Sequence, residues 1–203
     1  MRQAKNQGWT QALGRVVLVG ILMAGMAMPA QAGPREQAKR MHDRLAGVPP
    51  TDAVLTQMEN LIAGGNAVGA ANIAMDNVNF YNVTLKNFAA PWTNREQSVF
   101  VPLNDYIATV IGMIRDDKPF NTLLSADLTY VGRNGVVPAA PAANNNNHYQ
   151  QLEEQGVNLR DDLVEALQSS IQGIPQDATA GVMTSRAAAE AFFVAGTNRA
   201  MFR

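Results

Sequence analysis

The feature that most limits what this chain can fold into is a series of helix-length apolar patterns separated by glycine and proline. The clearest pattern covers residues 102–114, where apolar residues recur every three or four positions: Leu103, Ile107, Val110, Ile111 and Ile114. This spacing puts an apolar stripe on one face of a helix, and the chain must bury that stripe against other elements. No segment sustains the alternation of a β-strand. We therefore expect an all-α, irregular multi-helix domain of about seven or eight helices.

Start and stop signals delimit the other expected helices. Thr51 is placed to cap a helix over residues 52–63, and Gly64-Gly65 ends it. Asn158 and Ser185 are placed to cap two later helices. Together these signals and the apolar spacing predict helices over residues 35–45, 52–63, 66–75, 120–128, 159–172 and 186–195, while residues 78–88 fit a helix or a strand and residues 90–94 form a loop.

One segment interrupts the helical pattern. Residues 133–149 contain proline, alanine and four successive asparagines, a composition that favours a flexible surface loop. We expect a helical domain over residues 33–132, then this long Pro/Ala/Asn-rich loop, and then a C-terminal helical part over residues 150–203 that packs on the first.

The N-terminus has the three-part layout of a secretory signal peptide. Three basic residues precede or flank an apolar run over residues 16–28, and small residues follow as far as Ala32. A run of 13 residues is shorter than the roughly 20 that a membrane-spanning helix needs. We expect a signal peptide over residues 1–32, cleavage after Ala32, a periplasmic location and no stable membrane anchor.

Composition excludes several classes of site within this chain. Cysteine is absent, which rules out a covalent C-x-x-C-H haem, a thiolate metal site and a cysteine nucleophile. Two histidines, His42 and His148, are too few for a histidine-rich centre. Without residues 1–32 the chain has 13 basic and 17 acidic residues, a net charge of −4, which argues against nucleic acid as a partner. We expect no cofactor or metal in this chain.

No catalytic motif is present, so the question of an enzyme stays open, and five residues are binding candidates. Trp92 lies in a proline-flanked loop close to Phe88 and serves either as a partner platform or as a buried anchor. Asp105 is expected to stabilise the first turn of its helix, and Arg115 to pair locally with the two aspartates that follow it. Asp127, near the end of a short helix, is expected to be solvated, and Tyr130 completes the set.

The two histidines have plain interpretations. His42 precedes Asp43, but adjacent helix residues point about 100° apart and do not face each other. We expect His42 on a solvated helix face and His148 in the exposed loop.

Six short segments follow one another in a suggestive order: residues 44–51 (RLAGVPPT), 104–106 (NDY), 117–120 (DKPF), 123–131 (LLSADLTYV), 181–184 (GVMT) and 197–199 (TNR). This series resembles a bacterial family of exported, planctomycete-type cytochrome-c-associated domains of unknown function. Members usually carry C-x-x-C-H elsewhere in the chain, and their late Pro-x-x-Arg-Gly stretch is replaced here by Thr-Asn-Arg-Ala. The resemblance therefore implies either a haem-free relative or the N-terminal part of a longer protein.

The resemblance implies a helical, exported protein that works near c-type haem modules, and it brings no catalytic residues. Our leading hypothesis is an accessory or interaction module of a periplasmic electron-transfer system, whose partner is a c-type cytochrome or a haem-bearing segment. The alternatives are a haem-free periplasmic binding or structural protein and, in last place, a periplasmic enzyme that uses Asp105, Asp127 and Tyr130.

Overall fold

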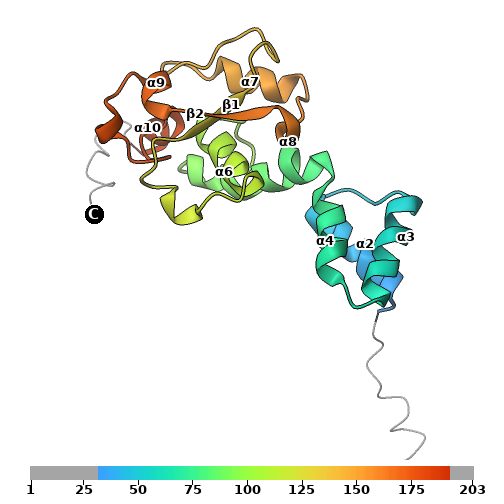
Figure 1. Ribbon diagram of the computed structural model, residues 1–203. Coiled ribbons are helices and arrows are strands. Elements are labelled where there is room, and N and C mark those ends of the chain that lie inside the picture. The colour runs from blue at the N-terminus through green and yellow to red at the C-terminus, as the bar shows by residue number, and fades with distance from the viewer. Residues whose placement is uncertain (1–31, 193–203) are drawn as a thin grey trace, which may run out of the picture. The chain divides into compact units, whose positions relative to one another are not determined.

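The chain folds mainly into helices joined by turns and by two longer loops, residues 94–104 and 133–146, in a computed structural model that describes residues 32–192 (Figure 1). The part of the chain with described coordinates contains nine α-helices and a single pair of β-strands. The all-α prediction is confirmed. The leader predicted over residues 1–32 lies outside the described residues except for Ala32. The last part of the helix predicted over 186–195 and the segment 197–199 also lie outside them.

The first three helices form as predicted and pack together. They are α2 (Pro34–Leu45), α3 (Asp52–Ala63) and α4 (Ala67–Met75). The Thr51 hydroxyl accepts a hydrogen bond from the Val54 N–H, and Gly64 follows the last residue of α3. Their shared core is a small cluster of buried side chains, centred on Met58 and completed by Ala38, Leu55, Ala70 and Ala74.

His42 does not lie on a solvated face, and that prediction is wrong. The chain reverses direction after α2 at Gly47, whose φ of +71° suits glycine. The turn brings the Val48 carbonyl oxygen 2.8 Å from His42 Nδ1, and the imidazole is only 2% exposed. His42 therefore fixes the turn that leads from α2 to α3.

Helix α6 (Asp105–Arg115) is the centre of the larger core, as the apolar stripe of residues 102–114 predicts. Nine of its eleven residues are buried, so it is enclosed on more than one face. The ambiguous segment 78–88 is helical: a π-helical stretch, η1 (Phe80–Leu85), leads into α5 (Lys86–Ala89), and the expected loop at 90–94 is a 3₁₀ turn, η2 (Ala90–Thr93).

Two of the predicted helices do not form as continuous helices, and a β-strand pair that was not predicted lies at or just after them. Residues 120–128 form only the 3₁₀ turn η3 (Phe120–Thr122), followed by β1 (Thr129–Gly132). Residues 159–172 divide into α8 (Leu159–Asp162), β2 (Leu163–Ala166) and α9 (Gln168–Gln172). The strands are antiparallel, with Thr129 opposite Ala166 and Gly132 opposite Leu163. All four residues of β1 are buried, so their backbone groups need partners, and this need overrides the helical spacing of 159–172.

The edge of β1 that faces away from β2 is closed by side chains from α6 and α7 (Asn147–Glu154). The Tyr130 N–H donates to Thr109 Oγ1 of α6 at 3.3 Å, and the Tyr149 hydroxyl of α7 donates to the Tyr130 carbonyl at 3.1 Å. The Gly132 N–H donates to His148 Nε2 at 2.9 Å. An edge strand covered in this way offers no free ladder to another chain.

His148 therefore is not an exposed loop residue, and the predicted loop 133–149 ends earlier than expected. Helix α7 begins at Asn147, and His148 is 3% exposed. Its Nδ1 lies 2.7 Å from the Ala139 carbonyl, so the loop folds back onto α7. Because Nε2 accepts from Gly132, Nδ1 carries the proton, and burial lowers the pKa of His148 below its ordinary value.

Candidate functional site

Asp105 holds two distant helices together. It lies in the first turn of α6, as predicted, and is 4% exposed. Oδ1 accepts from the Tyr106 N–H of the same helix at 2.9 Å, and the carboxylate makes further bonds to other helices. Oδ2 accepts from the Arg186 N–H at 2.6 Å, and Oδ1 accepts from the Ala187 N–H at 3.0 Å, at the start of α10 (Arg186–Phe192). Gln172 Nε2 of α9 adds a further bond, at 3.3 Å to Oδ2. Asp105 is therefore a cap for α10 supplied from across the core.

Asp127 has a similar role for α9. Its Oδ1 accepts from the Ser169 N–H at 2.7 Å and its Oδ2 from the Ser169 hydroxyl at 2.6 Å. It lies in the turn before β1, is half-buried, and is not the solvated residue at a helix end that the sequence predicts. Its carboxylate ties the start of β1 to the segment that follows β2.

Arg115 and Tyr130 do meet, through Asp116. The Arg115 guanidinium donates to both oxygens of Asp116, at 2.7 and 2.9 Å, so the predicted local pairing forms with the first of the two aspartates that follow it. The Tyr130 hydroxyl donates to Asp116 Oδ2 at 2.7 Å, and the Arg115 guanidinium carbon lies 5.6 Å from the centre of the Tyr130 ring. The Arg115 hydrogen bond lowers the pKa of Asp116, while burial and the bond to Asp116 raise the pKa of Tyr130.

This cluster is a joint between α6 and the strand pair. Arg115 Nη1 also donates to the carbonyls of Arg160 and Leu163, at 2.9 and 2.7 Å. Asp116 is held in its charged form and Tyr130 in its protonated form, so neither is poised to exchange a proton near neutral pH. Asp105, Asp127 and Tyr130, the residues of the enzyme hypothesis, thus each serve a different internal contact.

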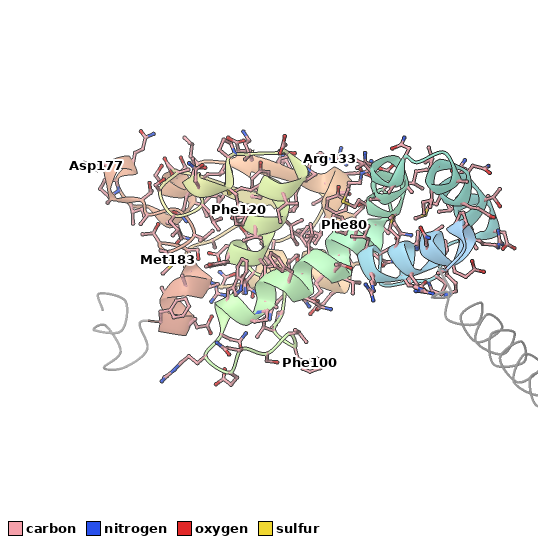
Figure 2. The ribbon with its side chains drawn as sticks, turned by 90° about the horizontal axis from the view of Figure 1, so that it is seen from below. Phe80, Phe100, Phe120, Arg133, Asp177 and Met183 are labelled. Carbon is pink, nitrogen blue, oxygen red and sulfur yellow. The ribbon has the colours of Figure 1, made fainter. Side chains whose placement is uncertain are left out.

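The fifth candidate, Trp92, lies on an exposed group of aromatic side chains. Its ring meets that of Phe88 edge to face, with centroids 4.7 Å apart, yet the two residues are 37% and 52% exposed. Phe88 and Phe120, which is 44% exposed, line a hollow of about 340 Å³ with Met113 and Ile114. We call Phe88, Trp92 and Phe120 the aromatic face; Figure 2 shows Phe120 on the segment that follows α6.

The sequence shows that Phe88 and Trp92 are close together, but it does not show that Phe120 lies beside them. Phe88 and Trp92 are four residues apart across α5 and η2, a spacing that brings side chains together on helical backbone. Phe120 comes from a separate turn, so only the fold brings it to the same hollow. Asp117 and Lys118 form the polar rim, and Lys118 pairs with Glu165 at 2.6 Å.

A second hollow, of about 390 Å³, is polar. Its lining comes from three separate parts of the chain: residues 93–104, residues 146–150 and α10. Thr93, Asn94 and Asn104 form the rigid part of its wall, since Asn104 Nδ2 donates to Thr93 Oγ1 and Asn94 bonds twice with the backbone of Ser98. We call this hollow the polar cleft.

Residues 32–192 contain no group of three or more histidine, aspartate or glutamate side chains arranged to hold a metal ion. Within the same range, none of the helices combines the length and apolar character required to cross a membrane. Comparisons of the chain with models of protein families, with curated protein sequences and with solved structures find no match. Function must therefore be argued from the geometry of the sites themselves.

Proposed function

We propose that this chain is an exported accessory module that docks onto a c-type cytochrome, or a haem-bearing segment, through its aromatic face. It contributes no cofactor of its own and acts by binding. The observation that carries the proposal is the exposure of Phe88 and Phe120 at one apolar hollow, with the exposed Trp92 ring packed edge to face on Phe88.

The grouping of these rings makes their exposure informative, since other exposed apolar residues, such as Phe100 at 92% and Val68 at 73%, do not line the hollow. Twenty-three buried residues form the larger core around α6, and the polar candidates Asp105, Asp127 and Arg115 are engaged in internal hydrogen bonds. Single exposed apolar residues are ordinary, whereas several that adjoin one hollow mark a contact surface. Tryptophan and its aromatic neighbours dominate binding energy where such a group meets a partner.

The choice of partner rests on the family resemblance and on interface size. Segments 104–106, 123–131 and 181–184 carry part of the resemblance, and the last two contact each other, since the Val182 N–H donates to the Leu123 carbonyl at 2.9 Å. Weak electron-transfer encounters use small interfaces, below about 1,200 Å² in total. Two aromatic rings at one hollow, with Trp92 beside them, suit a contact of that size with the apolar rim of a c-type haem.

The test is direct binding of purified chain to purified c-type cytochromes from the same periplasm, measured by titration calorimetry. We expect micromolar affinity and at least a tenfold loss in the double variant Phe88→Ala, Trp92→Ala, because two central aromatic side chains each contribute about 1 kcal/mol or more. Val68→Ala is the matched control, since Val68 is an apolar residue of α4 that is 73% exposed and lies outside the aromatic face.

If the double variant and the wild-type chain bind with equal affinity, the aromatic face is not the docking surface. Failure of every cytochrome of that periplasm to bind would refute the partner, and the haem-free binding-protein alternative would take its place. Circular dichroism on each variant checks that the fold is intact before binding is compared.

A further inference from the structure

We propose that the polar cleft is a binding site for a small zwitterion, a free α-amino acid or a dipeptide. This inference is independent of the aromatic face and of any cytochrome. Some polar groups of the cleft make hydrogen bonds within the fold, and others have no partner among the described residues. The proposal rests on the second group.

The wall of the cleft is fixed before any ligand arrives. Asn104 Oδ1 caps α6 by accepting from the Ile107 N–H at 3.0 Å, and the Thr93 hydroxyl donates to the Ala90 carbonyl at 2.9 Å. Thr93 and Asn104 are 7% and 6% exposed. Asn94 Nδ2 and Oδ1 both bond to Ser98, so the loop that carries the next two residues has a set conformation. Such a wall costs little ordering on binding.

The groups that line the cleft but serve no internal contact are both donors and acceptors. Arg95 and Glu96 are exposed and have no partner among the described residues. The Gln150 carboxamide is likewise unpaired within residues 32–192. Asn146 Nδ2 donates to the Leu103 carbonyl, and its Oδ1, which has no donor, is closed off from solvent beside the cleft. The cleft therefore retains unused capacity of both kinds.

The charges of the cleft are balanced, and this balance selects the ligand class. The lining holds two arginines, Arg95 and Arg186, and two glutamates, Glu96 and Glu190, and Arg186 pairs with Glu190 at 2.6 Å. A simple anion would meet two carboxylates, and a simple cation would meet two guanidinium groups. A ligand with a carboxylate for Arg95 and an ammonium group for Glu96 is attracted at both ends.

Size and apolar lining favour an amino acid or a dipeptide over a longer peptide. The cleft has about 390 Å³, near the lower end of the range for small-molecule sites. Ala187 and Ala191 lie one turn apart on α10 and, with Val101 and Pro102, supply an apolar part to the lining. A small side chain rests against this part while the charged termini engage the polar groups.

The experiment is calorimetry of the full chain with L-alanyl-L-alanine and with its blocked form, N-acetyl-L-alanyl-L-alanine amide, which keeps the shape and loses both charges. We expect saturable binding of the free dipeptide and binding of the blocked form weaker by about tenfold or more. Arg95→Gln and Glu96→Gln should each weaken the free dipeptide about tenfold, because each removes one charge-assisted contact. Both side chains are exposed, so the variants should fold.

Arg40→Gln is the matched control, because Arg40 is an exposed arginine of α2 with no part in the cleft. It should bind the dipeptide as the wild-type chain does. Amide NMR locates the site: the dipeptide should shift the side-chain signals of Gln150 and Asn146. Equal affinity for the free and blocked forms, no binding of the free dipeptide, or shifts confined to other parts of the chain would each overturn the proposal.

Discussion

Replacement of Asp105 tests whether the fold depends on one carboxylate that joins α6 to α10. The side chain is 4% exposed and accepts backbone N–H groups of Arg186 and Ala187 at 2.6 and 3.0 Å. Hydrogen bonds to a charged group contribute about 1.5–3 kcal/mol each. Loss of both in Asp105→Ala, partly offset by water, should lower the free energy of unfolding by about 3–5 kcal/mol. That is a large part of the roughly 5–15 kcal/mol of a typical domain.

The isosteric variant Asp105→Asn makes the test sharper. At an exposed helix cap asparagine replaces aspartate at little cost. Here each carboxylate oxygen accepts from a separate donor, so a carboxamide must place its own NH₂ against an N–H group of the protein. Asp105→Asn should therefore lose almost as much stability as Asp105→Ala.

Urea unfolding at pH 7, followed by far-UV circular dichroism, measures these differences. Asp177→Asn is the control: Asp177 is exposed in η4 (Gln176–Ala178), and Figure 2 shows it projecting from the end of its loop. Its replacement should change the free energy of unfolding by no more than about 0.5 kcal/mol. If Asp105→Asn proves as mild as Asp177→Asn, the carboxylate does not hold α10 in the way its distances indicate.

Two further outcomes concern β1 and its neighbours. Burial lowers the pKa of His148 in the folded chain, so the unfolded chain binds a proton first as the pH falls. The stability contributed by neutral His148 is therefore complete above pH 6.5 and decreases as the pH drops below that value. His148→Gln, which keeps one acceptor and one donor, should reduce this pH dependence in urea titrations between pH 7 and 5; an unchanged slope would contradict the assignment. Gly112→Ala should destabilise the chain by about 1–3 kcal/mol or more, because its Cβ would lie 2.2 Å from the Tyr130 ring. An unaltered urea midpoint in Gly112→Ala would show that α6 and β1 are less closely packed than described.

The sequence predicted helix boundaries best where a capping residue and a terminating glycine both lie directly beside the helix. Helix α3 begins after Thr51 and ends before Gly64, as expected, because capping depends on a few adjacent positions. The turn at Gly173 and the cap at Ser185 were predictable for the same reason: Gly173 has a φ of +67°, and the Ser185 hydroxyl accepts from the Ala188 N–H.

The strand pair was not predictable from local spacing. Leucines at positions 159, 163 and 167 repeat at a helical interval, yet residues 163–166 extend to meet β1. The partner residues are more than thirty positions apart, so a pattern within one segment carries no trace of them. The decision between helix and strand is made by the buried backbone of Thr129–Gly132.

The same separation explains what sequence reasoning missed about the candidate sites. Asp105 and Asp127 were chosen as isolated carboxylates, and their partners lie 81 and 42 positions away. The aromatic face was half visible, since Phe88 and Trp92 are close in sequence and Phe120 is not. The polar cleft was not visible, because three distant segments build it.

The reach of Asp105 across the chain also affects the order in which the molecule can assemble. The buried core of α2–α4 uses only residues within 38–74, so all of its residues are present early in synthesis, which starts at the N-terminus. The Asp105 carboxylate of α6 accepts from a backbone N–H group 81 positions later in the chain. Until that segment is present, the carboxylate remains hydrated. We therefore expect the larger core to close only after nearly the whole described chain has been synthesised, and α6 to stay loosely packed until then.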